Sequence, residues 1–89
     1  MKLINDDCLK VLPTLADKSV DLIITSPPYN IGMNYNNYKD SRNDYISWLS
    51  KIFNECCRVL KDDSHLFINI ASGKIDPFTS YKVAEKINW

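Results

Sequence analysis

Four consecutive residues, Ser26, Pro27, Pro28 and Tyr29, are the part of this sequence best suited to chemistry. Each proline fixes its own φ and holds the residue before it extended, and neither proline has an N–H to donate. The segment therefore presents hydrogen-bond acceptors, namely carbonyl oxygens and the Ser26 hydroxyl, beside the flat face of Tyr29. A rigid group of acceptors next to an aromatic ring suits a planar molecule that carries an NH₂ group.

The exocyclic amine of cytosine or adenine fits that description. Its nitrogen is a poor nucleophile because the lone pair is delocalised into the ring. Two acceptors, the Ser26 side chain and the Pro27 carbonyl, would draw the amine hydrogens out of the plane and aim the lone pair at an electrophile. Alignment of reactants lowers barriers by up to about 7–11 kcal/mol in well-oriented intramolecular reactions. A base inside a duplex would first have to be flipped out.

The same residues also allow a purely structural interpretation, in which two prolines end a strand, Ser26 caps a turn and Tyr29 packs in a core. Their surroundings favour chemistry. Residues 20–25 form an apolar run typical of a parallel strand covered on both faces, and residues 30–43 form a polar loop without a period. Ligands of open α/β sheets bind at the carboxyl ends of the strands, which is where the two prolines lie.

The elements around this segment alternate between strand and helix. Apolar residues on one helical stripe predict a helix from residue 45 to 60, at Tyr45, Leu49, Ile52, Cys56 and Val59. The other predicted elements are strands at 2–5 and 65–71, a helix after Asp7, a helix exit at 61–64, and a last helix after Asp76-Pro77 with a stripe of Phe78, Tyr81, Ala84 and Ile87. This order predicts an α/β fold with a three-stranded parallel sheet and flanking helices.

The composition indicates one small domain with no dominant charge. Its 89 residues include 11 Lys plus Arg and 11 Asp plus Glu, so net charge alone would not draw the chain to nucleic acid. No apolar run has the length of a membrane span, and residues 1–6 show no apolar signal region. An odd count of 3 cysteines fits a reducing cytoplasm, and one histidine without a CxxC pair argues against a zinc site.

Residues 25–32 resemble the catalytic motif of the amino-directed DNA methyltransferases, which use S-adenosylmethionine (SAM). That motif is Asp, Asn or Ser, then Pro-Pro, then Tyr, Phe or Trp. Residues 5–23 are similar to the acidic segment that precedes the motif in this family, and residues 44–68 to the helix and strand that follow it. The resemblance covers nearly all of the chain and implies a partial, Rossmann-like methyltransferase fold.

The resemblance also implies roles for single residues. Ser26 and Pro27 would accept hydrogen bonds from the amine, and Tyr29, after Pro28, would stack on the base. Asp7 matches the acidic position near the adenine of SAM, although a plain helix cap also explains it. The polar loop lies where family members contact DNA or are mobile, which implies DNA contacts for Asn30, Tyr35, Tyr38, Lys39 and Arg42.

One family feature is missing from the sequence. The family holds the methionine end of SAM in a glycine-rich loop, and neither Gly32 nor Gly73 belongs to such a loop. Relatives with an early catalytic motif place that loop and the target-recognition region later in the chain. Residues 1–89 are therefore expected to be the catalytic-motif half of a truncated methyltransferase domain, inactive alone, from an engineered truncation, a broken gene or a split enzyme.

The leading hypothesis is a fragment of a SAM-dependent methyltransferase that acts on double-stranded DNA in a restriction–modification system. Ser26 at the first motif position favours N4 of cytosine over N6 of adenine. A non-catalytic fragment that binds nucleic acid or a partner is the alternative, and methylation of an amine or amide in RNA or protein is a third reading. An exposed sheet edge would also permit self-association.

Overall fold

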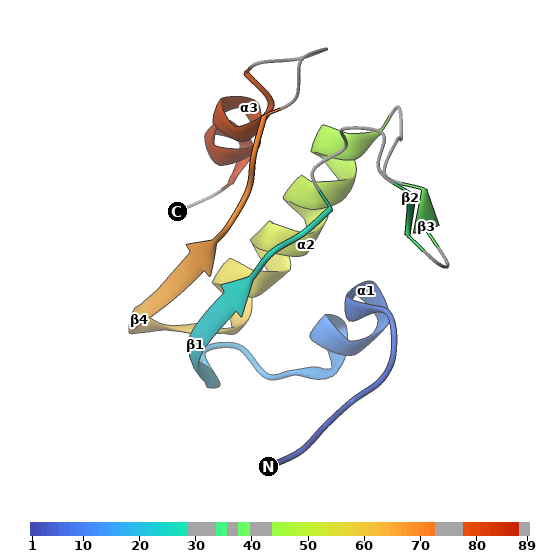
Figure 1. Cartoon of the computed structure of the whole chain (residues 1–89). Coiled ribbons are helices and arrows are strands. Elements are labelled where there is room, and N and C mark those ends of the chain that lie inside the picture. The colour runs from blue at the N-terminus through green and yellow to red at the C-terminus, as the bar shows by residue number, and fades with distance from the viewer. Residues whose placement is uncertain (29–33, 36–37, 40–43, 73–77, 88–89) are drawn as a thin grey trace.

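The computed structural model describes residues 1–28, 34–35, 38–39, 44–72 and 78–87. It has the expected α/β composition, and no helix in these ranges is long and apolar enough to cross a membrane (Figure 1). The elements in chain order are α1 (Cys8–Val11), the 3₁₀ turn η1 (Leu12–Thr14), β1 (Val20–Thr25), β2 (Asn34–Tyr35), β3 (Tyr38–Lys39), α2 (Tyr45–Val59), β4 (Leu60–Ile68) and α3 (Thr79–Lys86).

The strands β1 and β4 pair in parallel and form the central sheet. The register joins Leu22 to His65 and Thr25 to Ile68, with an irregularity between Val20 and Leu22. In the chain, α2 lies between β1 and β4 and returns the backbone to the starting edge of the sheet. The carboxyl ends of both strands therefore lie at the same edge (Figure 1). A parallel pair requires such a crossover, as the alternation of strand and helix in the sequence predicts.

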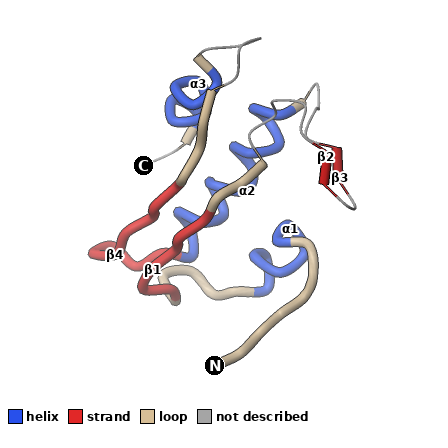
Figure 2. Tube along the Cα trace, in the orientation of Figure 1, coloured by secondary structure: helices blue, strands red, loops and turns tan. Residues whose placement is uncertain are grey.

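The core is built around α2. Its buried residues recur every three or four positions, at Tyr45, Leu49, Phe53, Cys56 and Val59. This stripe packs against Ile23, Leu66 and Ile68 of the sheet, which lies in front of the helix in Figure 2. The predicted stripe, which Phe53 widens, is confirmed, except that Ile52 lies at the margin of the core and Phe53 is fully buried.

Only one face of the central sheet is covered in the part of the chain that the structure describes. Leu22, Ile24 and Phe67 are 51%, 73% and 56% exposed. They alternate along the strands with Ile23 and Leu66, which face the core formed by η1, α2 and α3. The prediction that strand 20–25 is covered on both faces is therefore wrong for this structure, because its helices pack on the face of Ile23.

Residues 2–5, the expected first strand, form no strand, and Leu3 and Ile4 are exposed. Across the described ranges the parallel sheet has two strands instead of the three that were predicted. A short apolar run gains too little to order its backbone unless a neighbouring strand pairs with it. The polar segment predicted as an irregular loop contains a small antiparallel pair, in which β2 and β3 join Asn34 to Lys39 and Tyr35 to Tyr38.

The strand β4 begins at Leu60, directly after α2, whereas the prediction began it at His65. Residues 61–64, predicted as a helix exit, belong to the strand. Leu60 is already extended, with a ψ of 139°. The backbone N–H of Ser19 donates to the Val59 carbonyl at 2.8 Å, so the chain before β1 packs against the end of the helix. Leu60 then pairs with Val20 of β1, and this long-range pairing, which no local pattern records, begins β4 at Leu60.

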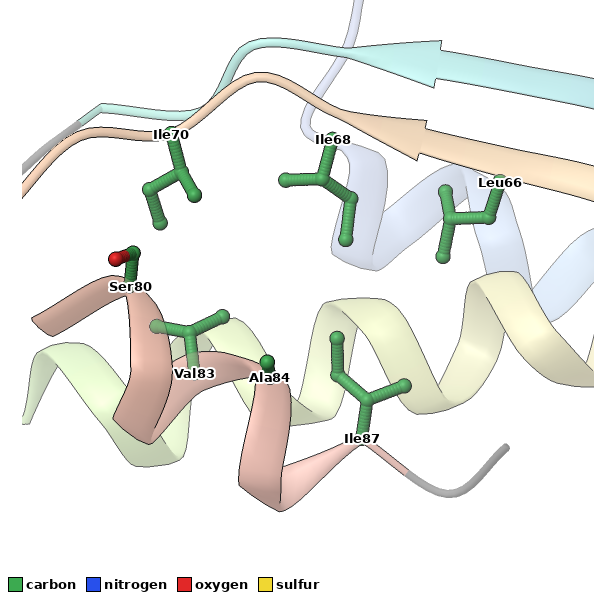
Figure 3. Close-up of a pocket in the computed structure, with 7 residues that line it drawn as sticks. All are labelled: Leu66, Ile68, Ile70, Ser80, Val83, Ala84 and Ile87. Carbon is green, nitrogen blue, oxygen red and sulfur yellow. The ribbon is translucent and has the colours of Figure 1, made fainter.

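The helix α3 packs through a different face than its sequence spacing suggests. Val83 and Ile87 are buried, whereas Phe78 and Tyr81 are 65% and 73% exposed. Ala84 is exposed as well, so of the predicted stripe only Ile87 is buried, because the neighbouring elements select the buried face. Figure 3 shows Val83, Ala84 and Ile87 opposite Leu66, Ile68 and Ile70 across a pocket of about 270 Å³. The predicted N-cap, Asp76-Pro77, lies outside the described residues.

Candidate active site

The segment from Ser26 to Pro28 leaves the sheet at the carboxyl end of β1, as predicted. The residue before it is held by the neighbouring chain, since the backbone N–H of Asn69 donates to the Thr25 carbonyl at 2.9 Å. Ser26 is exposed, while Pro27 and Pro28 are half-buried. An exposed hydroxyl on a supported backbone without N–H groups is the arrangement that an acceptor site for an amine requires.

Tyr45, the first residue of α2, holds the other end of the segment. Its hydroxyl donates to the Pro28 carbonyl at 2.5 Å. The side chain is only 3% exposed, and its ring lies 6.2 Å from the ring of Trp48. The apolar stripe of the helix predicts a buried Tyr45 but does not predict this contact. The available signal was that a buried tyrosine hydroxyl needs a polar partner.

These hydrogen bonds distinguish the carbonyls of the motif. The Thr25 and Pro28 carbonyls accept from Asn69 and Tyr45. In the ranges that the structure describes, no donor is hydrogen-bonded to the Pro27 carbonyl. The Pro27 carbonyl is one of the two acceptors that the sequence assigned to the amine, and the exposed Ser26 carries the other.

The structure describes only some of the other predicted site residues. Tyr29, Asn30 and Arg42 lie outside the described residues. Tyr35 lies in β2, and Tyr38 and Lys39 form β3. Stacking by Tyr29 and DNA contacts by the others stay predictions.

Asp7 is the N-cap of α1. Its Oδ1 accepts from the backbone N–H of Leu9 at 2.9 Å, and its carbonyl accepts from the N–H groups of Lys10 and Val11. The capping role foreseen as one interpretation of Asp7 is therefore present. A role beside the adenine of SAM stays a prediction.

A pocket of about 310 Å³ lies between α1, η1, β1 and α2. Its lining is mostly aliphatic and aromatic, and only Cys8, Thr25 and Cys56 add a thiol or a hydroxyl. Among the described residues no charged side chain lines it, so these residues offer no partner for the ammonium and carboxylate groups of SAM. The described residues of this pocket do not fit a complete SAM molecule.

The cysteines do not provide a nucleophile at neutral pH. All three are free. Burial raises the pKa of the Cys56 thiol to about 11, and it also raises the pKa values of Cys8 and Cys57 above their ordinary range. A thiol needs to lose its proton to attack, so these groups are poor nucleophiles.

The amino-acid sequence is similar to that of known proteins. Residues 20–89 match the family described as DNA methylase (N6_N4_Mtase). The chain is 42% identical over 74 residues to the Type II methyltransferase M.MjaVI of Methanocaldococcus jannaschii, covering 81% of this chain and 37% of that protein. It is 37% identical over 92 residues to the Type II methyltransferase M.BamHI of Bacillus amyloliquefaciens, covering 99% of this chain and 21% of that protein.

A further relative is the DNA adenine methyltransferase YhdJ of Escherichia coli, 38% identical over 68 residues, which cover 74% of this chain and 23% of that protein. The chain thus spans between 21% and 37% of the length of these three curated relatives. The family match includes β1, α2, β4 and the Ser26–Pro28 segment. The chain therefore belongs to the DNA methylase family.

Proposed function

We propose that this chain carries the amine-binding part of a SAM-dependent DNA methyltransferase. The observation that carries the proposal is the Ser26–Pro28 segment at the carboxyl end of β1. Its two ends are hydrogen-bonded, and among the described residues no donor bonds the Pro27 carbonyl. The family match supports the class of reaction. The names of the relatives, Type II methyltransferase and DNA adenine methyltransferase, support DNA as the substrate.

In the proposed reaction a flipped-out base donates the two hydrogens of its exocyclic amine to Ser26 Oγ and the Pro27 carbonyl. These hydrogen bonds localise the nitrogen lone pair and aim it away from the ring. SAM, when bound, supplies an electrophilic methyl group. Since the prolines hold the acceptors in place beforehand, little reorganisation is needed as charge develops on the nitrogen. Tyr29 stacks on the base, and Asp7 lies near the adenine of SAM.

We propose N4 of cytosine as the target in preference to N6 of adenine, because Ser26 opens the motif. Residues 1–89 would be the catalytic-motif half of the domain. The main SAM-binding loop and the target-recognition region would lie in polypeptide outside them. We place the enzyme in a cytoplasmic restriction–modification system.

A second candidate is a non-catalytic fragment that binds a partner. The observation in its favour is the exposed apolar face of the sheet at Leu22, Ile24 and Phe67. On this reading the Ser-Pro-Pro segment would only end a strand. The two candidates differ in whether the segment supports methyl transfer.

The test uses the 89-residue chain alone and a chimera in which it replaces the matching region of M.BamHI. Each is incubated with radiolabelled SAM and unmethylated DNA, and the DNA is digested to nucleosides to separate N4-methylcytosine from N6-methyladenine. We expect methyl transfer by the chimera and none by the chain alone. Replacement of Ser26 by Ala in the chimera should lower the rate on the order of 10²-fold, the loss seen when one preorganised catalytic hydrogen bond is removed.

The control is Ser72→Ala, which removes an exposed serine hydroxyl that bonds Ser80 and no residue of the motif, and should leave the rate unchanged. A chimera that unfolds cooperatively and binds SAM but transfers no methyl group would contradict the proposed function. N6-methyladenine as the product would contradict the choice of base alone.

A further inference from the structure

We propose that Tyr45 is a positioning residue that sets the conformation of the Ser26–Pro28 segment by hydrogen bonding to the Pro28 carbonyl. Tyr45 Oη lies 2.5 Å from that carbonyl oxygen, across a separation of 17 positions in the sequence. The consequence of this hydrogen bond for catalysis rests on the proposed function, whereas its effect on the conformation of the segment does not.

The backbone torsions of the segment show what Tyr45 adds. The rings of Pro27 and Pro28 fix their φ angles, and a following proline restricts the ψ angles of Ser26 and Pro27 to extended values. The ψ of Pro28 has no such restriction from a following proline. It determines where the Pro28 carbonyl points and how the chain leaves the site. The hydrogen bond from Tyr45 restrains that torsion, as the bond from Asn69 to Thr25 restrains the entrance.

The donor is itself held firmly. Tyr45 is 3% exposed, begins α2 and belongs to the buried cluster with Leu49 and Phe53. Its ring also lies beside Trp48, with centroids 6.2 Å apart. A buried tyrosine in a packed core has few positions for its hydroxyl. Because the core fixes the Tyr45 ring, the Tyr45 hydroxyl holds the Pro28 carbonyl in one position.

The contact also decouples the site from the segment between Pro28 and Asp44. Both ends of that segment meet at the Tyr45 hydrogen bond, and predicted DNA-contact residues lie between them. Loss of the Tyr45 hydroxyl should accordingly lower kcat more than it raises KM for DNA.

The test compares Tyr45→Phe, which keeps the ring and removes the hydroxyl, with Tyr81→Phe, which removes the hydroxyl of an exposed tyrosine on α3. In the 89-residue chain, NMR should show the Tyr45 hydroxyl proton in slow exchange and close to the Pro28 Hα. Tyr45→Phe should move the Pro28 carbonyl ¹³C resonance upfield and speed exchange of the Asn69 amide, and Tyr81→Phe should change neither.

In the chimera, Tyr45→Phe should lower kcat by roughly tenfold with KM for DNA and SAM unchanged, the loss of one ordinary hydrogen bond. An unchanged Pro28 resonance in a folded Tyr45→Phe chain would overturn the proposal. If that variant does not fold, absence of the hydroxyl contact in the wild-type spectrum would overturn it. If no chimera transfers methyl groups, the proposed function fails while the NMR result still decides the role of Tyr45.

Discussion

The single residues of the site act through their hydrogen-bond capacity, and Asp7 shows how one side chain can serve two purposes. One carboxylate oxygen accepts from the Leu9 N–H and caps α1. A carboxylate has a second oxygen and can accept further hydrogen bonds. Capping therefore does not exclude the proposed role beside the adenine of SAM.

The two roles of Asp7 separate in the variants Asp7→Asn and Asp7→Ala. Asn caps helices about as well as Asp, whereas Ala at an N-cap costs about 1 kcal/mol. We expect urea unfolding of the 89-residue chain to show a loss for Asp7→Ala and almost none for Asp7→Asn. If Asp7 also contacts SAM, calorimetry on the chimera should show weaker SAM binding for Asp7→Asn. Wild-type SAM affinity in that variant would leave Asp7 as a cap alone.

At the scale of elements, Arg58 fastens the end of α2 to the chain before β1. Its guanidinium donates to the Leu12 carbonyl at 2.9 Å and to the Leu15 carbonyl at 3.0 Å, and it pairs with Glu55 and Asp17. The hydrogen bonds that Arg58 donates to Glu55 and, to a lesser degree, to Asp17 raise the pKa of Arg58. The planar guanidinium of Arg58 thus joins α2 to η1 and to the loop that leads into β1.

This arrangement predicts that Arg58→Lys destabilises the fold nearly as much as Arg58→Ala. Lysine carries the charge but cannot direct several donors in fixed directions at separate acceptors. The measurement is the midpoint of urea unfolding. Lys61→Ala, which removes an exposed ion pair with Asp21 at 2.7 Å, is the control and should shift the midpoint little. A midpoint for Arg58→Lys close to wild type would show that charge alone suffices.

At the scale of the whole molecule, the main feature is a parallel sheet with one apolar face open to solvent in the described part of the chain. Leu22, Ile24 and Phe67 lie on that face, and the His65 ring stacks on Phe67 at 6.0 Å. Parallel sheets are almost always covered on both faces. We expect a second copy of the chain to cover this face when the 89 residues are studied alone.

The double variant Ile24→Thr with Phe67→Thr tests this expectation. Threonine suits a strand and removes apolar area from an exposed face, so unfolding should change little. Sedimentation should show concentration-dependent association of the wild-type chain that the double variant loses. Tyr81→Gln, at an exposed position on α3, is the control and should associate like wild type. A monomeric wild-type chain at all concentrations would exclude self-association through this face.

The sequence by itself determined the features that depend on local geometry. The rigidity of Ser26–Pro28 follows from the proline rings, and the period of apolar residues from Tyr45 to Val59 specifies the buried stripe of α2. The α/β class follows from the alternation of such segments. These features need only neighbouring residues, so they could be predicted before any contact between distant residues was known.

The tertiary structure decided the features that depend on distant residues. The face of β1 that is covered, the face of α3 that is buried and the start of β4 at Leu60 each depend on which elements pack together. The hydrogen bond from Tyr45 to Pro28 joins two patterns that the sequence shows separately, a helical stripe and a proline pair. Folding brings Tyr45 and Pro28 together, so the acceptor segment is restrained at its Pro28 end as well as at Thr25.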